Sequence, residues 1–548
     1  MRRIFPAFFV LICLNCFAQD TITRADLPVA ARVFDLSFTP SEIDSMYGNV
    51  KEINETVKKM HTHTLDNSVP MSLWQNPVLP GMKVNDRQEP VEWQIPTNVS
   101  MPQNRTELAF YSILQLASLI KNKKISSVEL TKFFIERLRK YSDQLQCTIS
   151  ITEDIALKEA QQADKEIAQG KYKSALHGIP YGLKDLFAVK GTKTTWGAAP
   201  FKDQVIEEDA YVYTKLKEAG AVLVAKFTLG ALAMGDKWFG GRTNNPWNLK
   251  HGSSGSSAGS TAATVAGLVP FAIGTETWGS IISPSTTCGA TGLRPTFGSI
   301  SRSGAMALSW SLDKIGPICR SAEDAAIVFN YLHGTDGKDL SAVSRPFNYK
   351  NVIDIRKMKI GYAKNYFDKL EKDAAEWQVL DAYKKLGVTL VPVNFPEDSA
   401  YDFEMMNIII SGESAAAFDE LTRKNIDDEL TWQTKNDWPN IFRSSRFVSA
   451  VDYINANRHR YLLMQKVNAM LQNFDAVICP TWGGNQSAIT NLTGNPAICF
   501  PIGFGKENLP KSITLVGGLY NEAELLEVAN AYQNSTGYSR IHPPAFMQ

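Results

Sequence analysis

The sequence has few cysteines, and outside the first eighteen residues none of them form a recognisable pair. Seven cysteines occur in 548 residues, and two of them lie in an apolar run at the N-terminus. The other five are far apart and form no C-x-x-C arrangement: Cys147, Cys288, Cys319, Cys479 and Cys499. Their low density excludes a disulfide scaffold, and we expect mostly buried thiols with at most one or two bridges.

An excess of either charge and a nucleotide motif are also missing. The formal net charge is +1, so nothing in the charge balance indicates nucleic acid as a partner. No G-x-x-x-x-G-K-[ST] sequence occurs, which excludes a phosphate loop of that form. His61 and His63 have no further histidine or cysteine nearby, so we expect a solvated pair and no metal site. No cofactor is predicted.

Long hydrophobic runs are absent apart from one short run at the N-terminus. Arg2 and Arg3 precede an apolar stretch over residues 4–17, and Ala18 follows it. This order is typical of a secretory signal peptide, and the run is too short for an ordinary membrane-spanning helix. We expect residues 1–18 to be removed after Ala18, which would leave a secreted or periplasmic protein of net charge −1. An uncleaved membrane anchor is the alternative.

Residues 19–106 are predicted to form an N-terminal extension. Thr39, Pro40 and Glu42 are typical of a helix start, with a capping threonine and a glutamate three residues later. Apolar residues then recur at steps of three and four up to Met60, which predicts an amphipathic helix. Six prolines between residues 69 and 102 predict an extended arm on the body of the protein.

Helix and strand patterns alternate over residues 107–548. "SSVE" (126–129) has the residues of a capping box, and "AVLVA" (221–225) and "AVIC" (476–479) are typical of short buried strands. Asn521 is expected to cap a last helix. Because strands and helices are interleaved, we expect an α/β fold with a sheet covered by helices on both faces. No repeat or low-complexity linker divides this segment, so one large catalytic domain is predicted.

A serine-rich stretch, "HGSSGSSAGS" (251–260), allows more than one interpretation. It contains G-x-S-x-G, which would make Ser257 the nucleophile of an α/β-hydrolase. That motif requires a hydrophobic strand directly before it, whereas "NNPWNLK" has turn residues. A flexible linker is also disfavoured, because the apolar sequence "TAATVAGLVPFAIG" follows at once.

Two more residues could act in catalysis together with this serine-rich stretch. Ser280 lies 24 residues after Ser256, and Lys184 stands in the apolar sequence "GIPYGLKDLF". Burial disfavours an ammonium group, so the pKa of Lys184 should fall, and a neutral amine can act as a general base. Taken one at a time, the serines could be turn caps and Lys184 a surface residue.

Three segments together resemble the motifs of the amidase signature family. They are "GIPYGLKD" (178–185), "SGSSAGS" (254–260) and "GTETWGS" (274–280), with "NPWN" (245–248) and "NLTGNPAICFPIGF" (491–504) as further matches. The resemblance extends over about residues 107–538. It implies the amidase signature fold, which is a mixed β-sheet between layers of α-helices.

The resemblance also implies a Ser–Ser–Lys triad. Ser280 matches the nucleophile, Ser256 the bridging serine that usually follows a cis peptide bond, and Lys184 the base. The triad would form an acyl-enzyme from an amide. Backbone N–H groups are expected to form the oxyanion hole at Thr277, Trp278, Gly279 and Ser280.

Departures from the family pattern concern the substrate. Trp278 stands where relatives often have glycine or aspartate, and Ile282 stands where many have arginine. The segment "FTLGALAMG" (227–235) also departs from the family pattern. We expect Ala233, Met234 and Trp278 to line the substrate pocket. The least family-like segment, about 341–474, is expected to shape that pocket.

The predicted function is hydrolysis of a small, aryl, fatty or peptide amide outside the cytoplasm. The partner is a small-molecule amide, a homodimer is left open, and no membrane span is expected in the mature chain. Three other functions compete: the A subunit of a tRNA-dependent amidotransferase, a non-catalytic binding protein on the same fold, and an esterase side activity. A signal peptide argues against the first, and an intact triad against the second.

Overall fold

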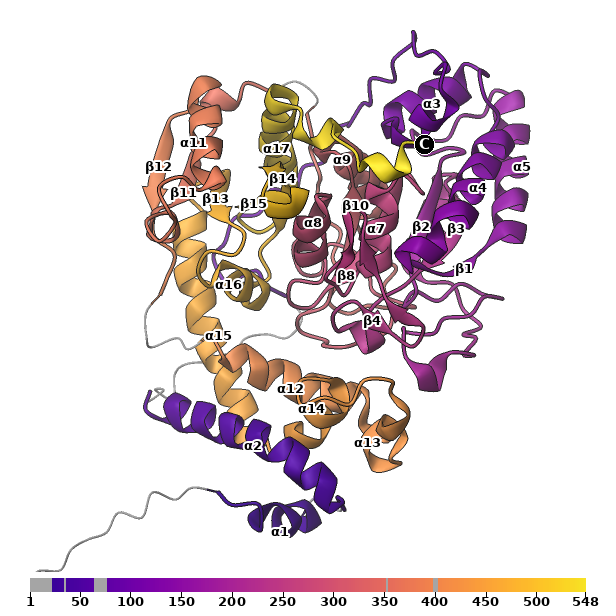
Figure 1. The fold of residues 1–548 in the computed structure, drawn as a ribbon. Coiled ribbons are helices and arrows are strands. Elements are labelled where there is room, and N and C mark those ends of the chain that lie inside the picture. Colours follow the sequence, from indigo (N-terminus) through magenta and orange to yellow (C-terminus); the bar gives the residue numbers. More distant parts are fainter. Residues whose placement is uncertain (1–21, 34–35, 64–75, 351–352, 398–402) are drawn as a thin grey trace, which may run out of the picture.

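The computed structural model describes residues 22–33, 36–63, 76–350, 353–397 and 403–548. The predicted signal peptide, residues 1–18, lies outside the described residues. An 11-stranded mixed sheet forms the centre, with helices packed against it (Figure 1). This arrangement confirms the α/β fold class.

The strands of the large sheet are short and mostly buried. They are β1 (Thr148–Ile151), β2 (Pro180–Lys184), β3 (Val222–Phe227), β8 (Phe271–Glu276), β9 (Thr291–Arg294), β10 (Lys314–Cys319), β11 (Ile360–Ala363), β12 (Leu390–Val393), β13 (Ala476–Pro480), β14 (Ala497–Phe504) and β15 (Pro510–Val516). Two small hairpins are formed by β4 (Lys237–Trp238) with β5 (Gly241–Arg242), and by β6 (Asn244–Asn245) with β7 (Asn248–Gly252).

The order of the strands places the predicted catalytic segments side by side. The order is β1-β3-β2-β8-β10-β9-β14-β15-β13-β11-β12. Strand β2 is parallel to both β3 and β8, whereas β10 is antiparallel to β8. Because β2 and β8 are parallel neighbours, their carboxyl ends meet at one edge of the sheet, where ligands bind in open α/β sheets. Lys184 ends β2, and Ser280 follows the end of β8.

Two groups of helices cover the sheet. In one group α7 contacts both α4 and α8, and α6, α9, α11 and α17 form the other group. Their bounds are α4 (Ser127–Leu145), α7 (Ala258–Val265), α8 (Ile282–Cys288), α6 (Tyr211–Glu218), α9 (Ala322–Leu332), α11 (Ala375–Lys385) and α17 (Glu522–Thr536). Further helices of the body are α3 (Ile113–Lys121), α5 (Glu153–Ala168), α10 (Lys364–Phe367) and α16 (Gln486–Thr493).

A separate helical layer lies below the sheet in Figure 1. It contains α1 (Asp26–Val33), α2 (Pro40–His61), α12 (Met405–Ala417), α13 (Asp419–Arg423), α14 (Trp438–Ser445) and the first part of α15 (Ala450–Leu471). The rest of α15 continues up to the sheet, where it packs in one apolar cluster with residues of β13. Helix α2 runs along α12 and α14 and contacts both. The N-terminal extension and the segment 341–474 therefore meet in space although they are far apart in the sequence.

Local sequence signals set several helix ends. Thr39 and Glu42 form the predicted capping box of α2, and Ser126 and Glu129 form that of α4. Helix α17 begins at Glu522 as expected, but the side chain of Asn521 makes no capping hydrogen bond. Asn521 therefore occupies the predicted N-cap position, but the prediction that its side chain caps the helix was wrong.

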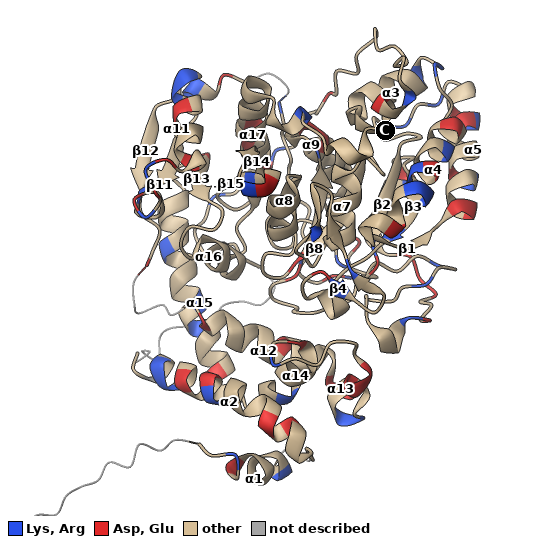
Figure 2. Cartoon of the chain, in the orientation of Figure 1, with Lys and Arg blue, Asp and Glu red and all other residues tan. Residues whose placement is uncertain are grey.

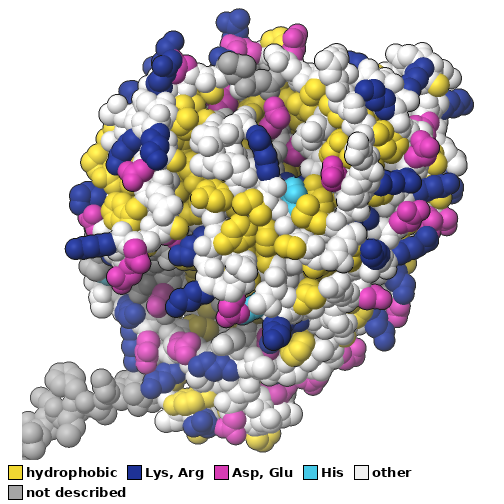
Figure 3. All heavy atoms as spheres, turned by 45° about the horizontal axis from the view of Figure 1, so that its top comes forward, with side chains coloured by type: hydrophobic (Ala, Val, Ile, Leu, Met, Phe, Trp, Pro, Cys, Tyr) yellow, Lys and Arg dark blue, Asp and Glu magenta, His cyan; other side chains and the backbone are white. Residues whose placement is uncertain are grey.

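The cysteines are buried and charges of both signs are mixed over the surface, as the composition indicated. Cys147, Cys288, Cys319, Cys479 and Cys499 are all buried and free. Among the described residues, no helix is long and apolar enough to cross a membrane. Residues of both signs are interspersed over the ribbon in Figure 2 and on the face seen in Figure 3.

Candidate active site

Lys184 occupies a buried position at the end of β2. Its side chain is fully buried, and its Nζ atom donates hydrogen bonds to Ser256 Oγ at 2.8 Å, Thr275 Oγ1 at 2.8 Å and Ser257 Oγ at 3.2 Å. Burial lowers the pKa of Lys184 to about 7, although the carboxylates of Asp313 and Glu276 oppose the shift. Above that pH the amine is mostly neutral and can accept a proton.

Ser256 lies two residues before the start of α7, in the predicted serine-rich stretch. The peptide bond between Gly255 and Ser256 is cis, as the family resemblance implied. Gly255 has no room for a side chain, because a Cβ atom there would lie 1.8 Å from the carbonyl oxygen of Gly235. The small residues of this stretch therefore let two backbone segments pack closely beside Lys184.

Ser280 lies at the same edge of the sheet as Lys184, after the end of β8. It belongs to the loop of residues 277–280 between β8 and α8, and its relative exposure is 8%. The backbone N–H of Ser257 donates to the carbonyl oxygen of Ser280 at 3.1 Å. Within the described ranges, no hydrogen bond directly joins the hydroxyls of Ser256 and Ser280. The structure thus joins Lys184 to Ser256 and holds Ser280 next to them through the backbone.

The loop that carries Ser280 offers backbone donors. In the part of the chain that the structure describes, no hydrogen bond uses the N–H groups of residues 277–280. Gly279 has φ +84, a conformation that L side chains rarely adopt, and its carbonyl oxygen accepts from Ser283 N–H at 2.6 Å. Free N–H groups next to a serine can stabilise a developing oxyanion. The oxyanion hole at Thr277, Trp278, Gly279 and Ser280 stays a prediction.

Glu276 organises this loop, a role that the sequence patterns did not predict. One carboxylate oxygen accepts from the N–H groups of Ile281 and Ile282, each at 2.9 Å. The other accepts from Arg294 Nη1 and Asn491 Nδ2, both at 2.9 Å. Burial alone would raise the pKa of Glu276, but Arg294 and these hydrogen bonds lower it to about 2. An acidic residue inside an otherwise uncharged motif was the signal present in the sequence.

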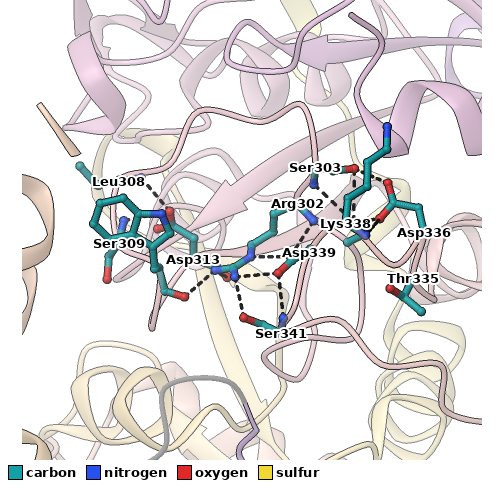
Figure 4. Close-up of polar contacts among 12 residues, drawn as sticks. Arg302, Ser303, Leu308, Ser309, Asp313, Thr335, Asp336, Lys338, Asp339 and Ser341 are labelled. Carbon is teal, nitrogen blue, oxygen red and sulfur yellow. Dashed lines mark hydrogen bonds and ion pairs between the residues drawn. The ribbon is translucent and has the colours of Figure 1, made fainter. Parts of the chain in front are cut away.

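Asp313 holds the same loop from the other side. Its Oδ1 atom accepts from Thr277 Oγ1 at 2.5 Å, and its Oδ2 atom accepts from the N–H groups of Leu308 and Ser309. Figure 4 shows Asp313 between Leu308 and Arg302, whose guanidinium pairs with Asp339 at 2.8 Å. Burial raises the pKa of Asp313.

Two cavities meet at the loop. The larger is a cleft of about 690 Å³ lined by Ser280, Gly255 and all three predicted pocket residues, Ala233, Met234 and Trp278. The smaller has a volume of about 260 Å³ and is lined by Thr275, Met306 and Arg302, among others. Both are lined by Ala233, Thr277 and Leu308. The Trp278 side chain is 41% exposed and forms part of the large cleft.

Ser257, the alternative nucleophile, occupies a different environment. It is fully buried and its hydroxyl donates to the carbonyl oxygen of Thr275 at 3.1 Å. Asp185, which follows Lys184, pairs with Lys226 at 2.9 Å, and both side chains are fully buried. Asp185 therefore has a structural partner within the core.

The profile of the Amidase family matches residues 129–490. The A subunit of the glutamyl-tRNA(Gln) amidotransferase of Acinetobacter baumannii is 33% identical over 481 residues, which cover 79% of this chain and 97% of that protein. The native peptide amidase of Stenotrophomonas maltophilia superposes with a TM-score of 0.71 at 26% identity, covering 80% of this chain and 99% of the other. A bacterial aryl acylamidase shares the fold, with a TM-score of 0.70 at 22% identity over 78% and 97% of the two chains.

The fold, the order of motifs and these similarities define a class of enzyme that cleaves carbon–nitrogen bonds of amides. The chain belongs to the amidase signature family.

Proposed function

We propose that the protein is a secreted or periplasmic amidase that hydrolyses a carboxylic amide through a seryl acyl-enzyme. The observation that carries the proposal is the 2.8 Å hydrogen bond between Lys184 Nζ and Ser256 Oγ at the cleft that Ser280 lines. A buried lysine with a pKa of about 7 is a base matched to neutral pH.

In the proposed mechanism, neutral Lys184 takes the proton of Ser256 as Ser256 takes that of Ser280. The Ser280 oxygen bonds to the amide carbon, and the carbonyl electrons move to oxygen, where N–H groups of residues 277–280 stabilise the charge. One such donor is commonly worth about 3 kcal/mol. The C–N bond then breaks, and the proton on Lys184 returns through Ser256 to the leaving nitrogen. Water repeats the sequence on the ester and releases the acid.

The size of the cleft supports an amide larger than a simple aliphatic one. Its volume of about 690 Å³ falls in the range of ordinary ligand pockets, and its lining mixes apolar side chains with amide, hydroxyl and charged groups. The structural similarity to a peptide amidase supports a peptide amide as the substrate, within the proposed group of small, aryl, fatty and peptide amides.

A role as the A subunit of an amidotransferase is the second candidate, and the identity of 33% to such proteins favours it. The N-terminal apolar run over residues 4–17 argues for export instead, away from a tRNA substrate. An amide assay on the isolated chain separates the two candidates, because an exported amidase hydrolyses amides without partner subunits.

The test is a screen of the purified protein against a library of amides, with mass-spectrometric detection of acid and amine. A fluorophosphonate probe should label Ser280 and should fail to label Ser280→Ala. Labelling at Ser257 would support the α/β-hydrolase alternative, and folded protein without labelling or turnover would support a binding role.

A further inference from the structure

Helix α2 lies outside the region matched by the family profile, yet it lines the catalytic cleft. The matched region is 129–490, whereas α2 is Pro40–His61. The cleft that contains Ser280 is also lined by residues of this helix, which are Asn49, Glu52, Ile53, Glu55, Thr56 and Lys59. Most of them follow one another at steps of three and four, so they share one face of α2.

Contacts with the body hold α2 in this position. Met46 and Met60 are buried, and Arg443 of α14 pairs with Glu42 at 3.1 Å while only 6% of its side chain is exposed. Lys435 pairs with Glu52 at 3.3 Å, and its carbonyl oxygen accepts from Asn49 Nδ2 at 3.0 Å. Buried apolar residues at both ends of the helix and a nearly buried ion pair fix which face looks into the cleft.

The charged residues of α2 in the cleft have ion-pair partners: Glu52 pairs with Lys435, Glu55 with Lys51 and Lys59 with Glu404. Beside them, Ile53 and Asn49 suit an extended chain with alternating apolar and amide groups. Ile53 shares the cleft with Leu308, Ile410 and Val448, which are apolar residues of the body. The Oδ1 atom of Asn49 is buried and has no hydrogen-bond partner among the residues that the structure describes. A buried acceptor without a partner is destabilising, and a rotation of the Asn49 side chain toward the cleft would let it accept from an N–H group of a bound substrate.

We infer that α2 is a wall of the substrate site, where Ile53 and Asn49 select amides whose acyl part is a peptide of several residues. This inference rests on the proposed amidase function and adds the substrate class. The C-terminal amide lies at Ser280, an apolar side chain packs on Ile53, and a backbone N–H donates to Asn49. Short amides that do not reach α2 are hydrolysed without its help.

The test compares two substrates with the same scissile bond, N-acetyl-leucinamide and an N-acetyl tetrapeptide amide that ends in leucinamide. Ile53→Trp fills the cleft beside α2, and Lys51→Trp places the same side chain at an exposed position of the same helix that does not line the cleft. Ile53→Trp should lower kcat/KM for the tetrapeptide amide at least tenfold and change that of the short amide less than twofold. Lys51→Trp should change neither value.

Asn49→Leu provides a second measurement that does not depend on filling the cleft. It should raise KM for the tetrapeptide amide with little change in kcat, because binding to the ground and transition states is lost equally. Circular dichroism and thermal unfolding check that all variants keep the fold.

Equal effects of Ile53→Trp on both substrates, or a wild-type enzyme that prefers the short amide, would overturn the role of α2 alone. If the wild type hydrolyses neither amide but is labelled at Ser280, labelling rates with ethyl and dodecyl fluorophosphonates replace the two substrates, and Ile53→Trp should slow only the dodecyl probe. A wild-type protein with neither turnover nor labelling would overturn the proposed function and this inference with it.

Discussion

Glu276 and Arg294 form a buried ion pair of 2.9 Å at the start of the loop that carries Ser280. Their side chains are 0% and 1% exposed. The same carboxylate holds the N–H groups of Ile281 and Ile282, directly after the nucleophile. The pair therefore fixes both ends of the loop, and it acts on the reaction through the position of Ser280.

Removing one charge of this pair should affect both stability and turnover. Glu276→Gln leaves Arg294 without a counter-charge, and breaking a buried pair costs about 3–5 kcal/mol in the free energy of unfolding. Denaturant unfolding measures that loss, and steady-state kinetics should show a lower kcat because the loop is displaced. The double variant Glu276→Gln/Arg294→Met should recover more stability than turnover.

An exposed ion pair is the control for that experiment. Lys369 and Glu397 lie 2.8 Å apart with side-chain exposures of 60% and 28%. Glu397→Gln should change the free energy of unfolding by less than about 1 kcal/mol and leave kcat unchanged. Similar losses at both pairs would show that the burial of Glu276 has no special effect.

Lys184 should determine the pH dependence of turnover. Because burial lowers its pKa to about 7, activity should rise through that pH and reach a plateau above it, where the amine is neutral. Lys184→Ala should lose several orders of magnitude in kcat. Lys184→Arg should not restore activity, since a guanidinium keeps its proton in this range.

A histidine base would give another pattern. Substitution of His333, His459 or His542 should then abolish turnover, while Lys184→Ala stays active. A folded Lys184→Ala variant with near-wild-type kcat would end the Ser–Ser–Lys assignment.

Asp313 should shift this pH profile. Its carboxylate raises the pKa of Lys184 by stabilising the ammonium form. Asp313→Asn should therefore lower the pKa of Lys184 and move the rise in kcat to lower pH. Asp339→Asn is the matched control, because Asp339 pairs with Arg302. A shift to higher pH in Asp313→Asn would contradict the electrostatic account.

Trp278 should limit the substrates that the cleft accepts. Its indole is part of the cleft beside the oxyanion loop, so Trp278→Gly should widen the range of accepted amides and keep some turnover. Trp482→Gly, at a residue that is 69% exposed and not part of the cleft lining, should keep the wild-type ranking of substrates. The same ranking in Trp278→Gly would show that the indole does not restrict the substrate.

Chelation should leave the amidase activity unchanged. Among the described residues, no group of three or more histidine, cysteine, aspartate or glutamate side chains could hold a metal ion. Incubation with EDTA followed by an amide assay checks this point. Loss of activity on chelation, restored by added zinc, would contradict the metal-free mechanism.

Local patterns predicted much of the fold, and the family resemblance predicted the approach of Lys184 to Ser256. The capping boxes of α2 and α4 follow from residues three positions apart, and the buried strands follow from short apolar runs. The order of three motifs and the family resemblance indicated which serines and which lysine to combine. Such signals lie within a few residues of each other or within one motif.

Contacts between distant segments could not be predicted in this way. The amphipathic pattern of α2 predicted a helix, but not that Asn49 would meet Lys435, 386 residues later. Glu276 was visible as an acidic residue, but its partners Arg294 and Asn491 come from other elements of the fold. The pattern of one helix or strand shows which face is apolar and leaves open what covers it.

The position of α2 has a consequence for how the protein opens on heating. Lys184 and Thr275 lie on β2 and β8, which have strands on both sides, whereas α2 lies in the helical layer outside the sheet and contacts α14, α12 and α1. Elements with fewer buried contacts open at lower free energy, so amide hydrogens of α2 should exchange with solvent before those of β2 and β8. Mild heating would then loosen the discrimination between long and short amides while the catalytic strands remain intact.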